Sequence, residues 1–210
     1  MTPLEILLQN YPQLADCKAE IEKSAQIIID CQEKGGTLFT CGNGGSCADA
    51  DHISGELLKG FCKKRPMTTE ERAALAAESP DVSELLSTKL QRGLRCISLM
   101  NFPGAGSAVR NDLGGELDVA QVLYALGRKG DVLLGISTSG NAKNVRYAVA
   151  VARLKGMKVL GMTGEGGGTL AQLAEVAIRV PSRETYRIQE YHLPIYHVLC
   201  RMVEDHFFAE

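Results

Sequence analysis

Five short apolar runs, separated by segments with helical periodicity, constrain the fold of this chain more than any other feature of its sequence. They are "TLFTC" (37–41), "RCISLM" (95–100), "DVLLGIS" (131–137), "KVLGMT" (158–163) and "VAIRVP" (176–181). Runs of this length that alternate with helices are typical of βαβ units, in which crossover helices join parallel strands. The sequence therefore predicts an α/β fold, a three-layer α/β/α sandwich around a mostly parallel five-stranded sheet.

Helical candidates occupy the spaces between these runs. They cover residues 46–60, 116–127, 141–154, 168–174 and 185–207. Apolar residues at helical spacing also fill residues 3–35, with Pro12 breaking the pattern and "KGG" from Lys34 ending it. A chain of 210 residues is long enough for one well-packed domain, so we expect a single domain over 1–210 that begins with N-terminal helices.

One segment, residues 67–93, fits this alternation poorly. It is rich in good helix formers, and it carries capping-box openings at Thr69 and Ser79 and a break at Pro80. We therefore expect one or two surface helices inserted between a helix and the next strand.

Charge and cysteine usage exclude several classes of protein. The net charge of -2 provides no electrostatic footprint for nucleic acid or an acidic membrane surface. The seven cysteines are scattered and form no C-x-x-C pair, as expected of thiols in a reducing compartment. The N-terminus lacks the basic start and apolar run of a signal peptide, and no stretch reaches transmembrane length. We expect a cytoplasmic protein without nucleic-acid or membrane partners.

Two strand-to-helix turns have unusual chemistry. "GNGGS" (Gly42–Ser46) offers Gly44 and Gly45, where the backbone can turn tightly or approach a ligand, and "STSGN" (Ser137–Asn141) offers three consecutive hydroxyls before a helix. In a parallel sheet, such turns place unpaired backbone N–H groups where phosphates bind. Ordinary helix capping explains either turn taken alone.

Neither turn matches a nucleotide-binding fingerprint. "GNGGSC" lacks the lysine of a P-loop, and no G-x-G-x-x-G follows a strand. The glycine-rich "GEGGG" (Gly164–Gly168) is interpreted as a mobile loop or turn. A phosphate monoester suits these neutral hydroxyls better than a nucleotide does.

Two pairs of side chains on separate helical segments could carry chemistry. His52 and Glu56 are four residues apart and share a helix face, and Gln189 and His197 are separated by roughly two turns. Each pair taken alone is also compatible with a surface contact or a satisfied histidine. Together they form an N/O donor set compatible with a divalent metal such as zinc, although the amide is an uncommon ligand.

Four stretches together resemble a known family. "CGNGGS...DADHISGELLKGF", "GDVLLGISTSGNAKNV", "AVARLKGMKVLGMTG" and "RIQEYHLPIYHVLC" are similar to the sugar isomerase (SIS) domain, and within it to the phosphoheptose isomerases. These enzymes convert sedoheptulose 7-phosphate to D-glycero-D-manno-heptose 7-phosphate. The resemblance covers nearly the whole chain except roughly 67–93, and it implies a flavodoxin-like sheet and a homotetramer with active sites between subunits and N-terminal helices at its core.

The resemblance also implies roles for individual residues. One zinc ion per subunit would be bound by His52, Glu56, Gln189 and His197, with Glu56 as the base that moves a proton between C1 and C2 and His197 as its acid/base partner. The phosphate would be held by Ser46, Ser137, Thr138 and Ser139, and the rest of the sugar phosphate by Asn43, Gly44, Gly45, Asp112 and Gln189. A carboxylate, an acid and a cation are what isomerisation through an enediolate requires.

The chain departs from the family pattern at several positions. Lys59 and Gly60 stand where the family has an arginine that contacts phosphate, so that contact is either moved to Lys59 or lost. Ala142 replaces a serine, Tyr186 replaces an aspartate, and Pro194 lies inside the last helix, where a kink is expected.

Two other functions remain open from the sequence alone. One is a non-catalytic SIS protein that binds a sugar phosphate or a partner of the replication-initiator type. The other is a different SIS reaction, such as that of an etherase or another phosphosugar isomerase. The metal-type pairs favour an isomerase, because a pure binder has no evident need for them.

Overall fold

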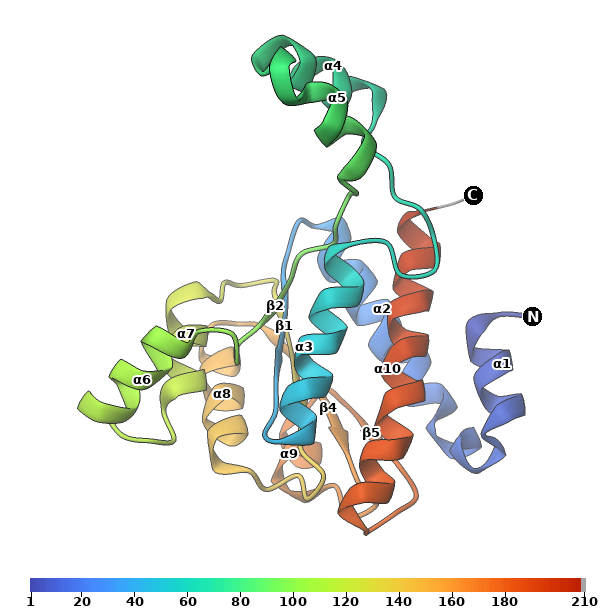
Figure 1. The fold of residues 1–210 in the computed structure, drawn as a ribbon. Helices are drawn as coiled ribbons and strands as arrows, with labels where there is room; N and C mark the ends of the chain where they lie inside the picture. The colour runs from blue at the N-terminus through green and yellow to red at the C-terminus, as the bar shows by residue number, and fades with distance from the viewer. Residues whose placement is uncertain (209–210) are drawn as a thin grey trace.

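The computed structural model describes residues 1–208 and contains one five-stranded parallel sheet (Figure 1). The strands lie in the order β2-β1-β3-β4-β5, and every neighbouring pair is parallel. They are β1 (Leu38–Cys41), β2 (Cys96–Ser98), β3 (Val132–Ile136), β4 (Lys158–Thr163) and β5 (Val176–Arg179). All five predicted strands are confirmed, and the order is the flavodoxin-like one expected from the resemblance.

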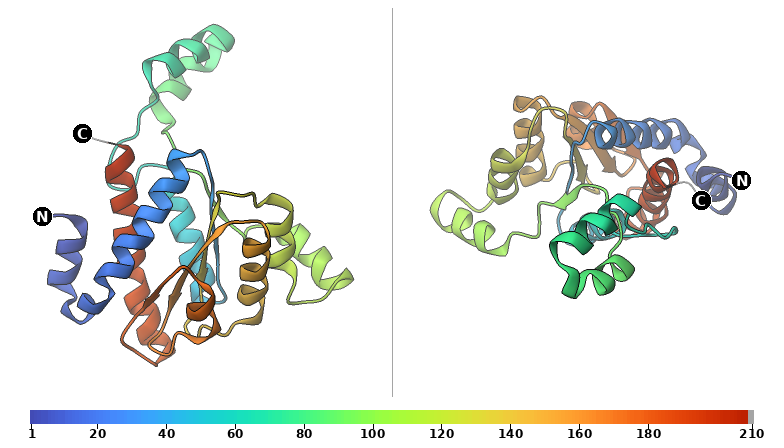
Figure 2. Two further views of the ribbon diagram at one scale, coloured as in Figure 1. Left: turned by 180° about the vertical axis from the view of Figure 1, so that it is seen from behind. Right: turned by 90° about the horizontal axis from the view of Figure 1, so that it is seen from above.

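Helices cover both faces of this sheet (Figure 2). One face packs against α2 (Lys18–Glu33), α3 (Gly45–Leu58) and α10 (Thr185–Phe207), and the other against α7 (Asp118–Leu126), α8 (Lys143–Leu154) and α9 (Gly168–Leu173). Successive strand residues point to opposite faces, so Leu38 packs into the first core and Phe39 into the second. The predicted three-layer sandwich is confirmed.

The N-terminal segment folds as expected, with a break at Pro12. α1 (Pro3–Asn10) begins with a capping box between Thr2 and Glu5, and a 3₁₀ turn (Pro12–Cys17) leads into α2. Pro12 occupies the first position of the 3₁₀ turn, where its missing N–H is not needed. The role of these helices in oligomerisation stays a prediction.

Residues 67–93 form a two-helix hairpin that projects from the body (Figures 1 and 2). It consists of α4 (Thr69–Glu78) and α5 (Pro80–Lys89), and neither helix contains a buried residue. The expectation of one or two surface helices is confirmed, with two present, but the first capping box starts one residue earlier than expected, at Thr68, whose partner is Glu71. Ser79 precedes α5 without a side-chain cap.

One helix, α6 (Pro103–Asp112), was not expected from the sequence, and another, α10, continues past a proline. α6 was not predicted, because glycines and small polar residues in "PGAGSAVRND" hide its periodicity. α10 is a single helix from Thr185 to Phe207 and continues across Pro194. None of the helices described within residues 1–208 is long and apolar enough to span a bilayer.

Candidate active site

The turn between β1 and α3 needs its glycines for its own folding. Gly44 has a positive φ of 56° and precedes the first residue of α3, and a Cβ on Gly42 would lie 2.5 Å from the Ser46 carbonyl oxygen. The Ser46 N–H donates to the Asn43 carbonyl at 3.0 Å, which closes the turn. A Cβ on Gly45 would overlap the Gln189 amide. Gly45 therefore lets α10 approach the N-terminus of α3.

The hydroxyl turn after β3 lies directly beside this glycine turn. Together they enclose a cavity of about 370 Å³ at the carboxyl ends of β1 and β3. Its lining includes the residues predicted to hold the phosphate, namely Ser46, Ser137, Thr138 and Ser139, and four of those predicted to contact the rest of the substrate, namely Asn43, Gly44, Gly45 and Gln189. β1 and β3 are the strands between which the chain order reverses, and ligands of open α/β sheets bind at that point. We name this cavity the sheet-edge pocket.

The glycine-rich segment after β4 supports the hydroxyl turn. Gly140 has a φ of 68°, and a Cβ there would overlap the Gly167 carbonyl oxygen. The Asn141 side chain accepts from the Thr169 N–H at 3.0 Å, and the Leu170 N–H donates to the Gly140 carbonyl at 2.9 Å. "GEGGG" is therefore a packed turn that leads into α9, and the interpretation as a mobile loop is not needed to explain its glycines.

Asn43 has a partner that the sequence did not reveal. Its amide and that of Asn144 exchange two hydrogen bonds, each of 2.8 Å, which join the turn after β1 to the first turn of α8. Asp112, in contrast, is exposed at the end of α6 and accepts from Asn111, and it does not line the sheet-edge pocket in this chain. The substrate contact expected of Asp112 stays a prediction.

A second cluster lies about two turns further along α3, where α3 and α10 run side by side (Figure 1). The Nε2 atom of His52 lies 2.9 Å from Oε1 of Glu56, and its Nδ1 atom lies 2.9 Å from the Tyr196 hydroxyl. The ring centroids of His52 and His197 are 5.1 Å apart. The structure thus brings His52, Glu56 and His197 together from two helices, as the sequence pairs suggested.

Two acceptor atoms of this cluster are buried without a hydrogen-bond partner in the described residues. They are Oε2 of Glu56 and Nε2 of His197. Burial, and then the neighbouring His52, lower the pKa of His197, whereas the Glu56 carboxylate raises it; the balance lies below the ordinary value. The His197 imidazole is therefore neutral and able to accept a proton at neutral pH.

A partly buried carboxyl group, Asp49, adjoins the cluster. Burial raises its pKa to about 6, against smaller lowering effects of the Tyr196 hydroxyl and His52. Burial, and then this carboxyl group, raise the pKa of Tyr196, so the phenol stays protonated at neutral pH. Tyr196 fixes the orientation of the His52 ring through its hydrogen bond to Nδ1.

Two further candidate residues lie away from the cluster. The Gln189 amide lies against Gly45 in the sheet-edge pocket, eight residues and about 12 Å of helix from His197. Lys59 lies at the far end of α3, with Nζ 3.7 Å from Oε2 of Glu56 and 3.0 Å from the Gly60 carbonyl oxygen. About 20 Å of α3 separates Lys59 from Ser46, so Lys59 does not reach the sheet-edge pocket of its own chain, and a phosphate contact by Lys59 stays a prediction.

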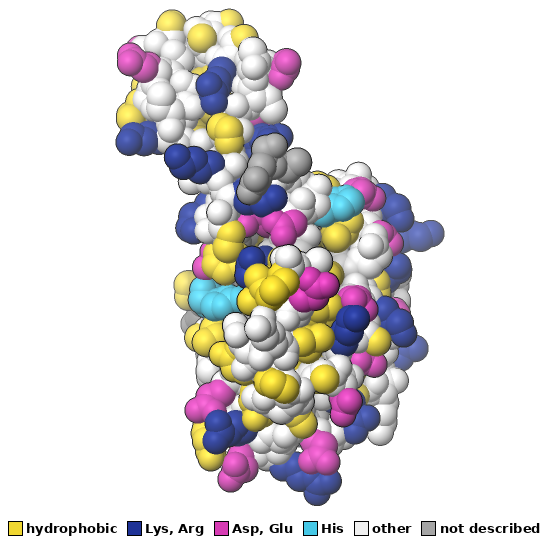
Figure 3. Space-filling model, turned by 90° about the vertical axis from the view of Figure 1, so that its right-hand side faces the viewer, with side chains coloured by type: hydrophobic (Ala, Val, Ile, Leu, Met, Phe, Trp, Pro, Cys, Tyr) yellow, Lys and Arg dark blue, Asp and Glu magenta, His cyan; other side chains and the backbone are white. Residues whose placement is uncertain are grey.

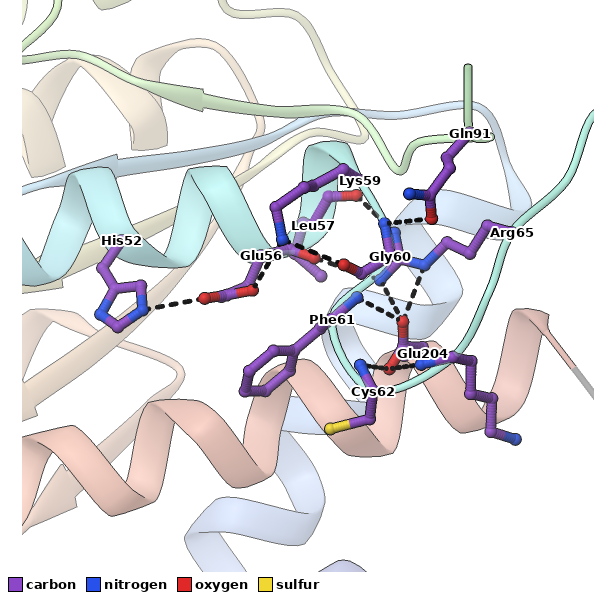
Figure 4. A network of polar contacts seen from close by, with 11 residues as sticks. His52, Glu56, Leu57, Lys59, Gly60, Phe61, Cys62, Arg65, Gln91 and Glu204 are labelled. Carbon is purple, nitrogen blue, oxygen red and sulfur yellow. Dashed lines mark hydrogen bonds and ion pairs between the residues drawn. The ribbon is translucent and has the colours of Figure 1, made fainter. Parts of the chain in front are cut away.

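A buried ion pair supports the Glu56 end of α3 (Figure 4). The Arg65 guanidinium and the Glu204 carboxylate are 2.8 Å apart and have no solvent exposure. Arg65 also donates to the carbonyls of Glu56 and Leu57, at 3.1 and 2.7 Å. The pair thus ties the end of α3 to the last turns of α10. These two helices carry the two halves of the cluster.

Glu204 completes this network by accepting from the chain that leaves α3. The N–H groups of Phe61, Cys62 and Lys63 donate to its carboxylate at 2.9, 2.8 and 3.2 Å. Burial alone would raise the pKa of Glu204, but these N–H groups and Arg65 outweigh burial and hold it below its ordinary value. Sequence reasoning missed both Arg65 and Glu204, because neither forms part of a local motif.

The donor chemistry of the cluster suits a divalent metal in part. Two imidazoles and a carboxylate are donor types that bind a divalent metal; of these, Glu56 and His197 each have a buried atom without a hydrogen-bond partner, and the Tyr196 hydroxyl holds the far nitrogen of His52. Within residues 1–208, however, no three His, Cys, Asp or Glu side chains have the geometry to hold an ion, and Gln189 lies two turns away. His52, Glu56 and His197 match the predicted zinc ligands in donor chemistry only, Gln189 lies apart from them, and the zinc site stays a prediction.

The fold and the sheet-edge pocket define the class of this protein. Profiles of the SIS domain match residues 12–94 and 118–199. This is an SIS-domain protein.

Individual relatives narrow that class to one family. The phosphoheptose isomerase of Rhodospirillum rubrum is 37% identical over 195 residues, which cover 93% of this chain and 90% of the relative. The structure of the phosphoheptose isomerase from Neisseria gonorrhoeae is 30% identical with a TM-score of 0.69, over 96% of this chain and 98% of that chain. The one from Francisella tularensis is 29% identical with a TM-score of 0.73, over 98% and 100%. The chain belongs to the phosphoheptose isomerase family.

Proposed function

We propose that this chain is an aldose–ketose isomerase that converts sedoheptulose 7-phosphate to D-glycero-D-manno-heptose 7-phosphate. The observation that carries the proposal is the alignment of two sites along α3. The sheet-edge pocket lies at its N-terminus, and the cluster of His52, Glu56 and His197 lies further along the same helix. The names of the relatives support the heptose as substrate.

The distance between the two sites suits a long sugar phosphate. His52 lies six residues beyond Ser46, or about 9 Å along the helix axis. Glu56 tilts toward the N-terminus of α3, and its carboxylate contacts His52. An extended chain spans about 1.2 Å per bond, so the roughly eight bonds from C1 of a heptose to its phosphorus span about 9 Å. A triose phosphate, with about four bonds, spans about 5 Å and falls short.

In the proposed reaction the phosphate is held by the Ser46, Ser137, Thr138 and Ser139 hydroxyls. The Glu56 carboxylate removes a proton from C1 of the ketose and returns it to C2, and the neutral His197 imidazole moves the hydroxyl proton from O1 to O2. No atom is gained or lost. Holding the phosphate fixes the reacting carbons relative to these groups, and each positioned acid or base contributes about 10²–10⁴-fold to the rate.

The proposal includes one zinc ion per subunit held by His52, Glu56 and His197, with Gln189 as the fourth expected ligand. A divalent metal would supply positive charge where the enediolate forms. Support comes from the unpartnered atoms of Glu56 and His197 and from the hydroxyl group that orients His52. Metal analysis of the purified protein tests this part, with about one zinc per chain expected and none contradicting it.

The proposal further includes a homotetramer in the cytoplasm. The family resemblance supports the tetramer, and the scattered thiols support a reducing compartment. Light scattering after size-exclusion chromatography would measure a mass four times that of the chain if the tetramer exists, and a monomer or dimer at micromolar concentration would contradict it.

A panel of sugar phosphates with five, six and seven carbons, followed by NMR, tests the reaction. We expect conversion of sedoheptulose 7-phosphate to its aldose with the highest kcat/KM of the panel. Conversion of none of them, with intact binding of sugar phosphate, would favour a non-catalytic SIS protein instead. Preference for a five-carbon substrate would contradict the length argument while preserving the reaction class.

A further inference from the structure

A cavity of about 520 Å³ lies at the base of the α4–α5 hairpin, outside the site described above. It is lined on one side by the chain that enters the hairpin, including Lys64 and Arg65, and on the other by Arg72 of α4 and the end of α5 with Lys89. Its volume is in the range of small-molecule sites, about 300–1,000 Å³. We name it the hairpin pocket.

The lining of the hairpin pocket carries an excess of positive charge. Lys64, Arg72 and Lys89 form no ion pair or side-chain hydrogen bond within residues 1–208, and no Asp or Glu of those residues lines the cavity. Figure 3 shows Lys and Arg side chains gathered along the lower rim of the projecting hairpin and at its junction with the body. Although the chain as a whole has a net charge of -2, three unpaired cations surround this cavity. The resulting positive potential favours binding of an anion.

The base of the pocket is held firmly. Pro66 and Gln91 form an antiparallel bridge, and Arg92 donates to the carbonyls of Arg65 and Pro66 at 2.7 and 3.0 Å. The charge of Arg65 is already balanced by Glu204, so Arg65 forms a wall of the pocket and adds nothing to its net charge. The two strands of chain at the base of the hairpin are thus fixed to each other, and the exposed cations Lys64, Arg72 and Lys89 surround that base.

The hairpin pocket is distinct from the sheet-edge pocket. It adjoins the C-terminal end of α3, whereas the hydroxyl turns lie at the N-terminal end, about 20 Å away along the helix. A phosphate held by Ser137 and Ser139 cannot reach Arg72 or Lys89. The two pockets therefore need separate ligands.

We infer that the hairpin pocket binds a small anion carrying two phosphoryl groups. Each phosphoryl group carries about -1.5 to -2 charge at neutral pH, so two of them match three cations, and one does not. Arg72 supplies the planar fork that binds phosphate oxygens in pairs, while Lys64 and Lys89 act as point charges. The Ser87 and Thr88 hydroxyls at the rim donate to backbone carbonyls of α5, so the three cations carry the proposed contacts.

Titration calorimetry of the full-length protein with inorganic pyrophosphate at 0.15 M salt tests this inference. The test variant is Arg72→Gln/Lys89→Gln, and the matched control is Lys23→Gln/Lys129→Gln, which removes the same charge from exposed positions elsewhere. We expect saturable pyrophosphate binding by the parent and the control. The test variant should bind pyrophosphate about 100-fold more weakly, since each lost cation costs about tenfold in affinity. Orthophosphate should bind to the parent more weakly than pyrophosphate does.

Two outcomes would overturn the inference. One is the absence of saturable pyrophosphate binding to the parent protein, and the other is equal affinity in the parent and the test variant. Metal content measured before and after titration separates binding from extraction of a metal by pyrophosphate, because extraction would be the same in both variants. Circular dichroism confirms that the hairpin is still folded. The measurement is independent of the proposed isomerase activity.

Discussion

Replacing Glu204 with leucine should destabilise the protein far more than loss of an ordinary surface contact. The change leaves the Arg65 guanidinium buried without its partner and removes the acceptor of the Phe61, Cys62 and Lys63 N–H groups. Breaking a buried ion pair from one side costs about 3–5 kcal/mol. For a chain of this length, each kcal/mol corresponds to about 2–4 °C in Tm, so we expect a loss of roughly 6–20 °C.

Urea denaturation at fixed protein concentration measures this loss of unfolding free energy. Lys63→Gln is the matched control, because it breaks the partly exposed Lys63–Asp205 pair in the same segment and should cost at most about 1 kcal/mol. The double variant Arg65→Met/Glu204→Leu should recover part of the loss, since it leaves no buried charge unpaired. A single Glu204→Leu variant within about 1 kcal/mol of the parent would refute the reasoning.

Two further predictions concern buried groups elsewhere in the fold. His192 is fully buried, neither ring nitrogen meets hydrogen-bond geometry with a residue in 1–208, and burial, opposed by the nearby Thr163 backbone, lowers its pKa from 6.5 to about 4. The imidazole binds a proton below pH 6.5 in the unfolded chain but only below about pH 4 in the folded protein. As the pH falls from 6.5 to 4, the unfolding free energy should therefore decrease by about 3 kcal/mol because of this residue. His192→Leu should flatten the dependence of unfolding free energy on pH there, and an unchanged profile would contradict the assignment. Gly140→Ala should lower the unfolding free energy by about 2 kcal/mol or more, because it places a side chain at a positive φ and against the Gly167 carbonyl. The control Gly166→Ala, whose new side chain meets open space, should cost almost nothing. Thermal denaturation compares the two, and equal stability of the two variants would be inconsistent with the packed turn.

The five strands could be predicted because each is a short apolar run between helical segments, whereas their flavodoxin-like order was implied by the family resemblance. The two halves of the proposed site were also accessible from the sequence. His52 and Glu56 share a helix face by spacing alone, and the hydroxyls after β3 and the glycines after β1 meet because parallel strands end at one edge. Local pattern was sufficient wherever the relevant contact lies within one element or at one sheet edge.

Contacts between distant segments could not be predicted in the same way. Arg65 and Glu204 are 139 residues apart, and nothing near either of them in the sequence indicates a buried pair. Asn144 meets Asn43 across 101 residues for the same reason. The position of Gln189 against Gly45 depends on how α10 packs on α3, and helical spacing alone does not fix that packing.

The glutamate on α3 is the group on which the proposed reaction depends most. Its conservative replacement, Glu56→Gln, keeps the size of the side chain and removes the base. Turnover of sedoheptulose 7-phosphate by the two proteins, followed by NMR and with folding checked by circular dichroism, is therefore the most direct test. We predict conversion by the parent protein and a loss of about 10²–10⁴-fold in kcat for Glu56→Gln. A folded Glu56→Gln variant that turns over at the parent rate would contradict the account.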